Sequence, residues 1–321
     1  SVHRPQRRVT PVSPAIGPTG GAFLVVGGDS EIGAALLDHL ARYGQTAVGT
    51  TRRRERLGDD RLWLDLSDFD ESWAPPSGIK AACVCAARSR LADCAADPSG
   101  SWALNVDQTA RLVARLSRLG IYTLFLSSNQ VFDGKIAFVP PDAPVNPVSE
   151  YGRQKAAAEE RVLTAGASSH QGTAVLRLSR VLGPVTPTVA SWASALRRGE
   201  HVTAFSDMVL APVPVELVAQ AAHSLMTDSA AGIFHLSGTQ DVPYSHFARA
   251  LALRLGRSPS LVREVSAATA GLPPGSTPSH TTLDSALLRD RYHLTPPDLL
   301  STLGLQPTGD PSPGPSPPVP R

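Results

Sequence analysis

A short apolar run, a glycine-rich turn and a helical run follow one another near the start of this chain, and this unit constrains the fold most. The apolar run is residues 22–26, the turn is residues 27–33, and the helical pattern of residues 34–40 ends near Gly44. Such a unit brings backbone N–H groups and a helix N-terminus up to the pyrophosphate of a nucleotide. It predicts a nucleotide-binding half in which the cofactor lies against Gly27, Asp29, Ser30, Glu31, Ile32 and Gly33.

Further apolar runs alternate with helical runs. We expect strands at 46–51, 62–66, 81–87, 123–126 and 173–178, and helices at 102–119 and after Tyr151. This alternation predicts an α/β fold, a Rossmann-type doubly wound parallel sheet with right-handed crossovers. Helical runs at 188–198, 215–227 and 244–255 and a strand at 232–236 are expected mainly in a smaller C-terminal α/β domain over the carboxyl ends of the strands.

The two ends of the chain differ from the rest in composition. Residues 1–20 are proline-rich with little apolar periodicity, and residues 305–321 are dominated by Pro, Gly and Ser, so we predict a disordered leader and a disordered tail. Between them we expect an NAD(P)-binding domain at 21–180, whose core also takes up part of 205–240. A mainly substrate-binding domain is expected at 181–304.

Composition excludes several classes of protein. With 42% hydrophobic residues, 321 residues can bury a sizeable core, and 30 Lys+Arg against 28 Asp+Glu favour neither nucleic acid nor an anionic membrane as partner. No apolar run approaches the roughly 18 residues that span a bilayer, and residues 1–20 lack a signal-peptide core, so we expect a cytoplasmic protein. The three cysteines fit neither a disulfide frame nor a zinc site, and no metal is expected.

Residues suited to acid–base chemistry follow the strand at 123–126. Tyr151 and Lys155 stand four residues apart in a helical segment, which places both side chains on one face. A phenol with a reference pKa of about 10 is a poor acid near neutrality, but a neighbouring ammonium lowers that pKa. Tyr151 is therefore a candidate general acid or base, and Ser128 could hold the same substrate oxygen. Together they suit carbonyl–alcohol interconversion with a hydride from a cofactor, although Tyr-x-x-x-Lys alone often arises by chance.

Other positions bear on the cofactor. The strand at 46–51 ends in Arg52, Arg53 and Arg54 rather than in the acidic residue that binds an NAD ribose hydroxyl. Arginines there suit a 2′-phosphate, so NADP(H) is favoured and NAD(H) is the alternative; a solvated charged loop is the other interpretation. The remaining cofactor-binding candidates are the adenine-edge residues Asp65 and Leu66, the small residues Ala86 and Ala87, the helical Asn105, and Lys155.

At this point the chain resembles an extended short-chain dehydrogenase/reductase, most closely the dTDP-4-dehydrorhamnose reductase family. The resemblance rests on residues 126–134, 146–155 and 158–159, continues in the family's order to 278–284, and covers about 22–303. It implies NAD(P)H bound by a Rossmann domain and a nucleotide-linked sugar bound by the C-terminal domain. It also implies a catalytic triad in which Tyr151 protonates the ketone oxygen, Ser128 polarises it, and Lys155 tunes the phenol while holding the nicotinamide ribose.

Several positions depart from the family's pattern. On the cofactor side, Ser30 replaces the middle glycine and Cys85 replaces a usual Asn, which puts close approach to the pyrophosphate in doubt. On the substrate side the departures are Arg88, Arg90, Asn129, Gln130, Arg180 and Thr277. If the three arginines converge, they suit an acidic or phosphorylated substrate group; otherwise they are surface arginines with buried stems.

A kept triad with changed sugar-facing positions suggests an NAD(P)H-dependent reductase of another nucleotide-activated keto sugar, serving carbohydrate biosynthesis. A noncatalytic NADP-binding regulator, like the beta subunit of methionine adenosyltransferase that shares this family's fold, is one alternative. A sugar epimerase of the same superfamily is another, whereas a dehydratase is disfavoured because no Asp-Glu pair follows Ser128. Family analogy alone points to a homodimer.

Overall fold

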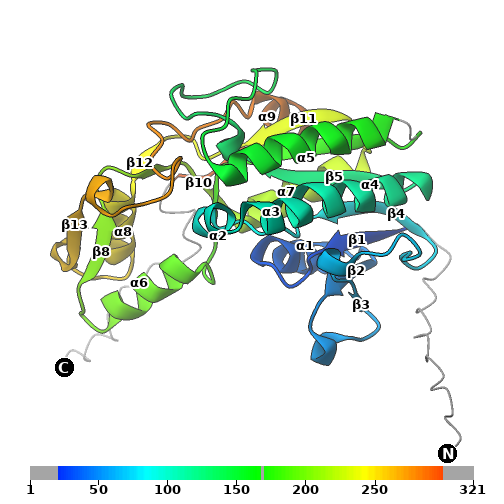
Figure 1. Ribbon diagram of the computed structural model, residues 1–321. Coiled ribbons are helices and arrows are strands. Elements are labelled where there is room, and N and C mark those ends of the chain that lie inside the picture. The colour runs from blue at the N-terminus through cyan, green and yellow to red at the C-terminus, as the bar shows by residue number, and fades with distance from the viewer. Residues whose placement is uncertain (1–20, 168–169, 299–321) are drawn as a thin grey trace, which may run out of the picture.

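A seven-stranded, wholly parallel sheet forms the centre of the protein, as the computed structural model shows for residues 21–167 and 170–298 (Figure 1). The strand order is β11-β6-β5-β4-β1-β2-β3, so two βαβ halves run outward from β1 and β4, the arrangement of a Rossmann fold. The predicted leader lies outside the described residues, and so does the predicted tail. The strands are β1 Ala22–Val26, β2 Ala47–Thr51, β3 Arg61–Trp63, β4 Ile79–Val84, β5 Tyr122–Ser128, β6 Thr173–Leu178 and β11 Gly232–Leu236.

Both faces of this sheet are covered by helices, which explains why its strands are continuous apolar runs. Phe23 and Val25 of β1 pack toward one face, while Leu24 packs toward the other. The first face is covered by α1 (Glu31–Arg42), α7 (Val215–Thr227) and α9 (Ala286–Tyr292). The second face carries α4 (Thr109–Arg118) and α5 (Glu150–Ala167), with α2 (Leu91–Ala96) and α3 (Pro98–Trp102) at its edge (Figure 1).

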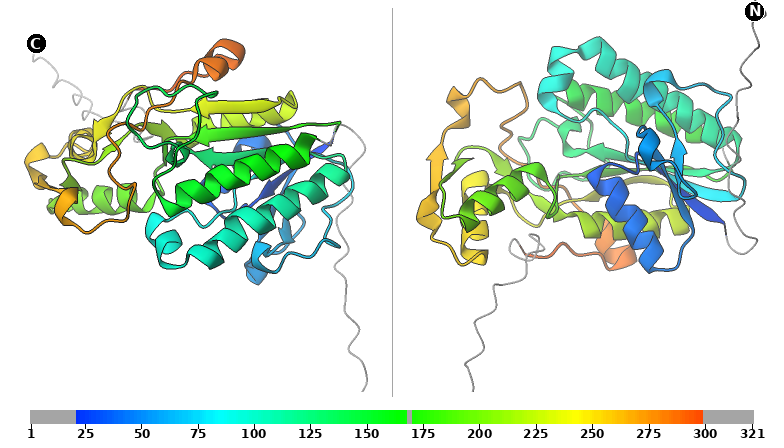
Figure 2. Two further views of the ribbon diagram at one scale, coloured as in Figure 1. Left: turned by 45° about the horizontal axis from the view of Figure 1, so that its top comes forward. Right: turned by 90° about the horizontal axis from the view of Figure 1, so that it is seen from below.

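A smaller lobe follows β6 and lies beside the large sheet in every view (Figure 2). Its core packs α6 and α8 against short strand pairs, with Leu196 and Phe247 at the centre. After the first part of this lobe the chain returns to the large sheet, because α7 packs on α1 and β11 pairs with β6. The lobe contains α6 Pro187–Arg197, α8 Tyr244–Arg254, and the pairs β7 (Arg180–Leu182) with β10 (Pro212–Pro214), β8 (Val202–Phe205) with β13 (Val262–Val265), and β9 (Val209–Leu210) with β12 (Val242–Pro243).

Three predicted elements end or bend at other places than expected. The strand predicted at 62–66 stops at Trp63, because Asp65 accepts the N–H of Ser67 and starts a 3₁₀ turn. The strand predicted at 81–87 stops at Val84, where the next two N–H groups both bond to the oxygen of Val26. The helix predicted at 102–119 is interrupted by a π-helical segment, Ala103–Gln108.

None of the described helices is long and apolar enough to cross a membrane.

Candidate functional site

A cavity of about 1050 Å³ lies where the carboxyl ends of the parallel strands face the smaller lobe. Its walls come from the turn after β1, the ends of β2, β4 and β5, the start of α5, and parts of β7, β9 and α8. Most of the predicted site residues meet there, as expected for a ligand site of an open parallel sheet. They are Gly27, Asp29, Ser30, Glu31, Ile32, Arg52, Arg53, Asp65, Leu66, Ala86, Ala87, Ser128, Asn129, Gln130, Tyr151, Lys155 and Arg180.

The glycine-rich turn forms a backbone cradle at one end of the cavity. Gly27 has φ +86°, and a Cβ there would lie 2.8 Å from the nitrogen of Ala86, so the two loops approach as closely as only glycine permits. Gly33 does not line the cavity but packs on the turn, since a Cβ there would lie 2.2 Å from the oxygen of Gly27. The cradle and the N-terminus of α1 therefore fit a dinucleotide pyrophosphate.

Ser30 has a role that we did not predict. Its Oγ accepts the N–H of Gly33 at 3.0 Å and donates to the oxygen of Gly27 at 2.8 Å, so it caps α1 and closes the turn. A serine just before a helical run is a known N-cap signal, and it could have been recognised in the sequence.

Arginines and one aspartate lie at the end of the cavity that is formed by the turn after β1 and the residues that follow β2. Arg52 and Arg53 line the cavity, whereas the guanidinium of Arg54 stacks 4.7 Å from the ring centroid of Trp63. Asp29 accepts a hydrogen bond from Thr51 and pairs with Arg56 at 2.9 Å. Burial raises the pKa of Asp29, but the bonds from Thr51 and Arg56 outweigh it and lower that pKa. The negative charge of Asp29 in the turn is thus offset by the positive charge of Arg56.

Tyr151 and Lys155 of α5 both line the cavity. Lys155 Nζ donates to the oxygen of Leu126 at 2.8 Å, lies 4.4 Å from the ring centroid of Phe125, and is 5.8 Å from that of Tyr151. Burial lowers the pKa of Lys155 to about 8, against an opposing effect of Glu159. Burial also raises the pKa of Tyr151, so our expectation that Lys155 lowers it is wrong for this structure. Loss of hydration at the buried phenol is the main cause of this rise in pKa.

Ser128 and Gln130 organise the loop that follows β5. Ser128 Oγ accepts the N–H of Gln130 at 3.2 Å and donates to Asn129 Oδ1 at 3.4 Å, which starts a 3₁₀ turn. The Gln130 side chain accepts from Ser149 at 3.1 Å and donates to the oxygen of Gly275 at 3.4 Å. Gln130 therefore joins the reaction centre to residues 272–281, which form part of the outer wall.

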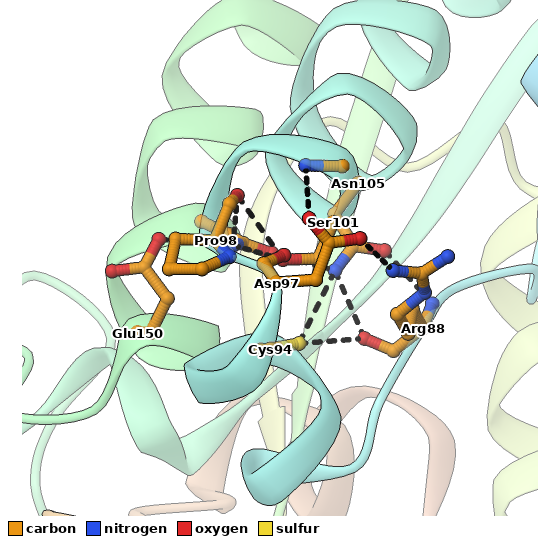
Figure 3. Close-up of polar contacts among 9 residues, drawn as sticks. Arg88, Cys94, Asp97, Pro98, Ser101, Asn105 and Glu150 are labelled. Atoms are coloured by element: carbon orange, nitrogen blue, oxygen red, sulfur yellow. Dashed lines mark hydrogen bonds and ion pairs between the residues drawn. The ribbon is translucent and has the colours of Figure 1, made fainter.

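Arg88 and Arg90, which were predicted among the substrate-binding residues, do not line the cavity, so the three arginines do not converge. Arg88 Nη1 pairs with Asp97 Oδ2 at 2.9 Å (Figure 3), and Arg90 is exposed at the start of α2. Of these arginines only Arg180 lines the cavity. The side chain of Asn105 bonds to both the N–H and the carbonyl oxygen of Arg88, and this fixes the backbone of Arg88.

Asn105 was predicted to bind cofactor, but it lies behind the cavity wall rather than in it. Its Oδ1 accepts the N–H of Arg88 at 2.8 Å and its Nδ2 donates to the oxygen of Arg88 at 2.9 Å. The same Nδ2 donates to Gln154 Oε1 at 2.8 Å, and Gln154 Nε2 donates to Ser101 and Glu150 at 2.7 and 2.9 Å. This network joins α5, which carries Tyr151, to the loop after β4 that contains Arg88. Sequence reasoning missed Gln154 because no local pattern marks it.

The chain is similar to known proteins in family, in sequence and in structure. A family model, the RmlD substrate binding domain, matches residues 22–304. Methionine adenosyltransferase 2 subunit beta of Bos taurus is 28% identical over 163 residues, 50% of this chain and 47% of that protein. A dTDP-4-dehydrorhamnose reductase of Sinorhizobium fredii is 27% identical over 163 residues, 48% and 53% of the two chains. The chain thus spans about half the length of these curated relatives.

Solved structures resemble nearly the whole of the described chain. MoeE5 in complex with UDP-glucuronic acid and NAD has a TM-score of 0.74 at 22% identity, covering 89% of this chain and 97% of that one. A dTDP-4-dehydrorhamnose reductase from Bacillus anthracis in complex with NADP has a TM-score of 0.73 at 17% identity, with the same coverage. At these identities the likeness shows the fold alone.

Proposed function

Because this chain belongs to the RmlD substrate binding domain family, we propose that it is an NAD(P)H-dependent reductase of a nucleotide-activated keto sugar. The observation that carries this proposal is the convergence of Ser128, Tyr151 and Lys155 on the cavity that also contains the glycine cradle. A bound nicotinamide coenzyme supplies the hydride. The protein has to bind the ketone, hold its oxygen and deliver a proton to it.

Tyr151 is the proton donor in this proposal. Burial raises the pKa of Tyr151, so its phenol is protonated at neutral pH and can donate a proton, although the same shift makes it a weaker acid. Its side chain lines the cavity and makes no hydrogen bond to the described residues that would compete with a substrate. Ser128 binds the same oxygen through its hydroxyl, and the ammonium of Lys155 holds the ribose hydroxyls of the coenzyme.

The adenosine end favours NADP(H). Arg52 and Arg53 line it and suit a 2′-phosphate, which bidentate guanidinium groups bind well. The negative charge of Asp29 would oppose such a phosphate, but Arg56 offsets it. NAD(H) remains the alternative, because similar folds are solved with NAD as well as with NADP.

The substrate end combines one cation with an apolar wall. Arg180 would bind the diphosphate of a nucleotide-linked sugar, and Met208, Tyr244 and Leu272 would cover its less polar parts. Among the described cavity-lining residues of the smaller lobe and of residues 272–281, Arg180 is the only Lys or Arg. Its loss should therefore weaken substrate binding strongly.

The test is to titrate the purified protein with NADPH and NADH by fluorescence and then to follow coenzyme oxidation with a panel of nucleotide-linked 4-keto sugars. Turnover of a panel member by the wild type, and its loss in Tyr151→Phe with NADPH binding kept, would support the reductase. A fully active Tyr151→Phe enzyme would refute the mechanism.

A noncatalytic, coenzyme-binding regulator is the second candidate. It is favoured by the similarity to methionine adenosyltransferase 2 subunit beta, and Lys155 could be kept in a regulator merely to bind ribose. Tight NADPH binding without turnover of any panel member would favour this candidate.

A further inference from the structure

A carboxylate of the glycine-rich turn bonds to a hydroxyl of the smaller lobe. Thr186 Oγ1 donates to Glu31 Oε1 at 2.5 Å, although the two residues are 155 positions apart in the chain. The same Oγ1 accepts the N–H of Gly183 at 2.8 Å, and Thr186 is only 3% exposed. Glu31 begins α1 and lines the cavity, whereas Gly183 and Thr186 do not line it. The contact therefore joins the turn after β1 to the smaller lobe through residues outside the cavity wall.

The hydroxyl of Thr186 is not used in the way that its place in the chain predicts. Thr186 immediately precedes α6, and a threonine at that position usually accepts an N–H of its own helix. Here it makes no such bond and instead bonds to Glu31 and Gly183. Gly183 packs closely, since a Cβ there would lie 2.8 Å from Glu31 Oε1. We call these three residues, Glu31, Gly183 and Thr186, the Glu31 junction.

The Glu31 junction lies at the end of β7, the strand that carries Arg180. β7 is three residues long, and Gly183 follows its last residue. Its partner strand β10 has a proline at each end, so within β10 just Val213 has an N–H to donate. A strand with so few ladder bonds depends on what holds its ends. Ser179 holds the start with a 2.6 Å hydrogen bond to the backbone of the residue before β10, and the Glu31 junction holds the end.

We propose that the Glu31 junction positions Arg180 for the substrate, which makes Glu31 and Thr186 positioning residues. This inference rests on the proposed function, in which Arg180 binds the diphosphate of a nucleotide-linked sugar. Glu31 belongs to the turn that fits the coenzyme pyrophosphate, so the junction ties the coenzyme end of the cavity to the strand of Arg180. The pairing of a guanidinium with a phosphate depends on such placement. Loss of the junction should therefore weaken substrate binding and leave coenzyme binding intact.

The experiment compares the wild type with Thr186→Val and Thr186→Ser. Uridine 5′-diphosphate and thymidine 5′-diphosphate are the probes, and the protein is saturated with NADPH so that the coenzyme end is occupied. In Thr186→Val, the Kd for the diphosphate that the wild type binds should rise at least about threefold, an effect typical of residues that act without touching the ligand. The Kd for NADPH should stay unchanged. Thr186→Ser keeps a hydroxyl that can donate and accept, so it should restore the affinity of the wild type.

Ser266→Ala is the matched control. Ser266 also donates to a carboxylate of the smaller lobe, Asp207 Oδ2 at 2.6 Å, but neither residue lines the cavity. Its replacement should change no Kd, whereas a general loosening of the lobe would appear in both variants. With a nucleotide-linked 4-keto sugar that the wild type turns over, Thr186→Val should raise KM and leave kcat unchanged, because Ser128 and Tyr151 are untouched.

Gly183→Ala is the second variant if Thr186→Val does not fold. Its added Cβ would displace the Glu31 carboxylate, so it should give the same selective loss. The inference is overturned by an unchanged diphosphate Kd in Thr186→Val, by an equal loss in Thr186→Ser or Ser266→Ala, by an equal loss of NADPH binding, or by failure of both diphosphates to bind the NADPH-saturated wild type. Failure of the wild type to bind NADPH, or to oxidise it with any panel member, would instead refute the proposed function, so the two failures are distinguishable.

Discussion

Lys155 Nζ donates a 2.8 Å hydrogen bond to the main-chain oxygen of Leu126, which ties the ammonium of the candidate site to β5. Burial lowers the pKa of this ammonium to about 8. The charge that is proposed to hold the coenzyme ribose is therefore lost within an accessible pH range.

We expect the affinity for NADPH to fall as pH rises through about 8, because the charged form binds the ribose hydroxyls and is present only below the pKa. The Kd should rise about tenfold between pH 7 and pH 9, because the charged fraction of Lys155 falls about tenfold over that range. In Lys155→Arg this step should disappear, since a guanidinium stays charged. A flat wild-type titration would contradict the assignment of Lys155.

Tyr151→Phe should lower kcat by at least about 100-fold, the usual contribution of a general acid. The Kd for NADPH should change little, because the ring is kept and the phenol makes no hydrogen bond within the described residues. Tyr292→Phe is the control, since Tyr292 bonds to Asp228 outside the cavity and its loss should leave kcat unchanged. Steady-state and single-turnover kinetics measure kcat and the rate of the chemical step in both variants.

The strands and the centre of the site were predictable from the sequence because they depend on local pattern and chain order. Strands covered on both faces are continuous apolar runs, so β1, β6 and β11 were placed at their observed bounds. Parallel strands end at one edge, which is why the glycine turn, Arg52 and Ser128 meet in one cavity.

The parts that sequence reasoning missed depend on contacts between distant residues. The side chain of Arg88 turns outward because Asp97 pairs with it and Asn105, 17 residues away, holds its backbone. No spacing or composition encodes that geometry. The raised pKa of Tyr151 likewise follows from burial, which a pair of residues four positions apart does not reveal.

Reversing the charge of Arg52 and Arg53 together should lower the affinity for NADPH at least about tenfold relative to NADH, because one or two charge-assisted bonds to the 2′-phosphate are lost. Arg54→Glu is the matched control, since Arg54 stacks on Trp63 and does not line the cavity. Parallel titrations with both coenzymes measure the ratio. If the ratio does not move, these arginines are solvated bystanders.

Arg180→Ala and Arg88→Ala should behave differently. Arg180 lines the cavity, so its loss should raise the KM for an anionic substrate at least about tenfold. Arg88 pairs with Asp97 in an exposed salt bridge, so its loss should leave KM unchanged and cost less than about 1 kcal/mol of stability. Steady-state kinetics of both variants test the contrast, and a raised KM in Arg88→Ala alone would reverse our placement of the two side chains.

His235 should make the fold acid-sensitive. It is fully buried, with Nδ1 3.0 Å from the oxygen of Val139 and Nε2 3.3 Å from Arg177 Nη1, so the neutral ring donates to the first and accepts from the second. Burial, aided by the charge of Arg177, lowers the pKa of His235 to about 4. Below the reference pKa of about 6.5, His235 binds a proton in the unfolded chain but stays neutral in the folded chain until the pH approaches 4.

Stability should therefore be lost as pH falls from 6.5 toward 4, by about 2 kcal/mol between pH 7 and pH 5 from this residue. The lowered pKa values of His39 and His223 add losses of the same sign. Urea unfolding of wild type and His235→Gln at the two pH values measures the difference, because glutamine can keep a donor and an acceptor but takes up no proton. The exposed His201→Gln should retain the full acid loss. If His235→Gln retains it as well, the acid sensitivity arises elsewhere in the protein.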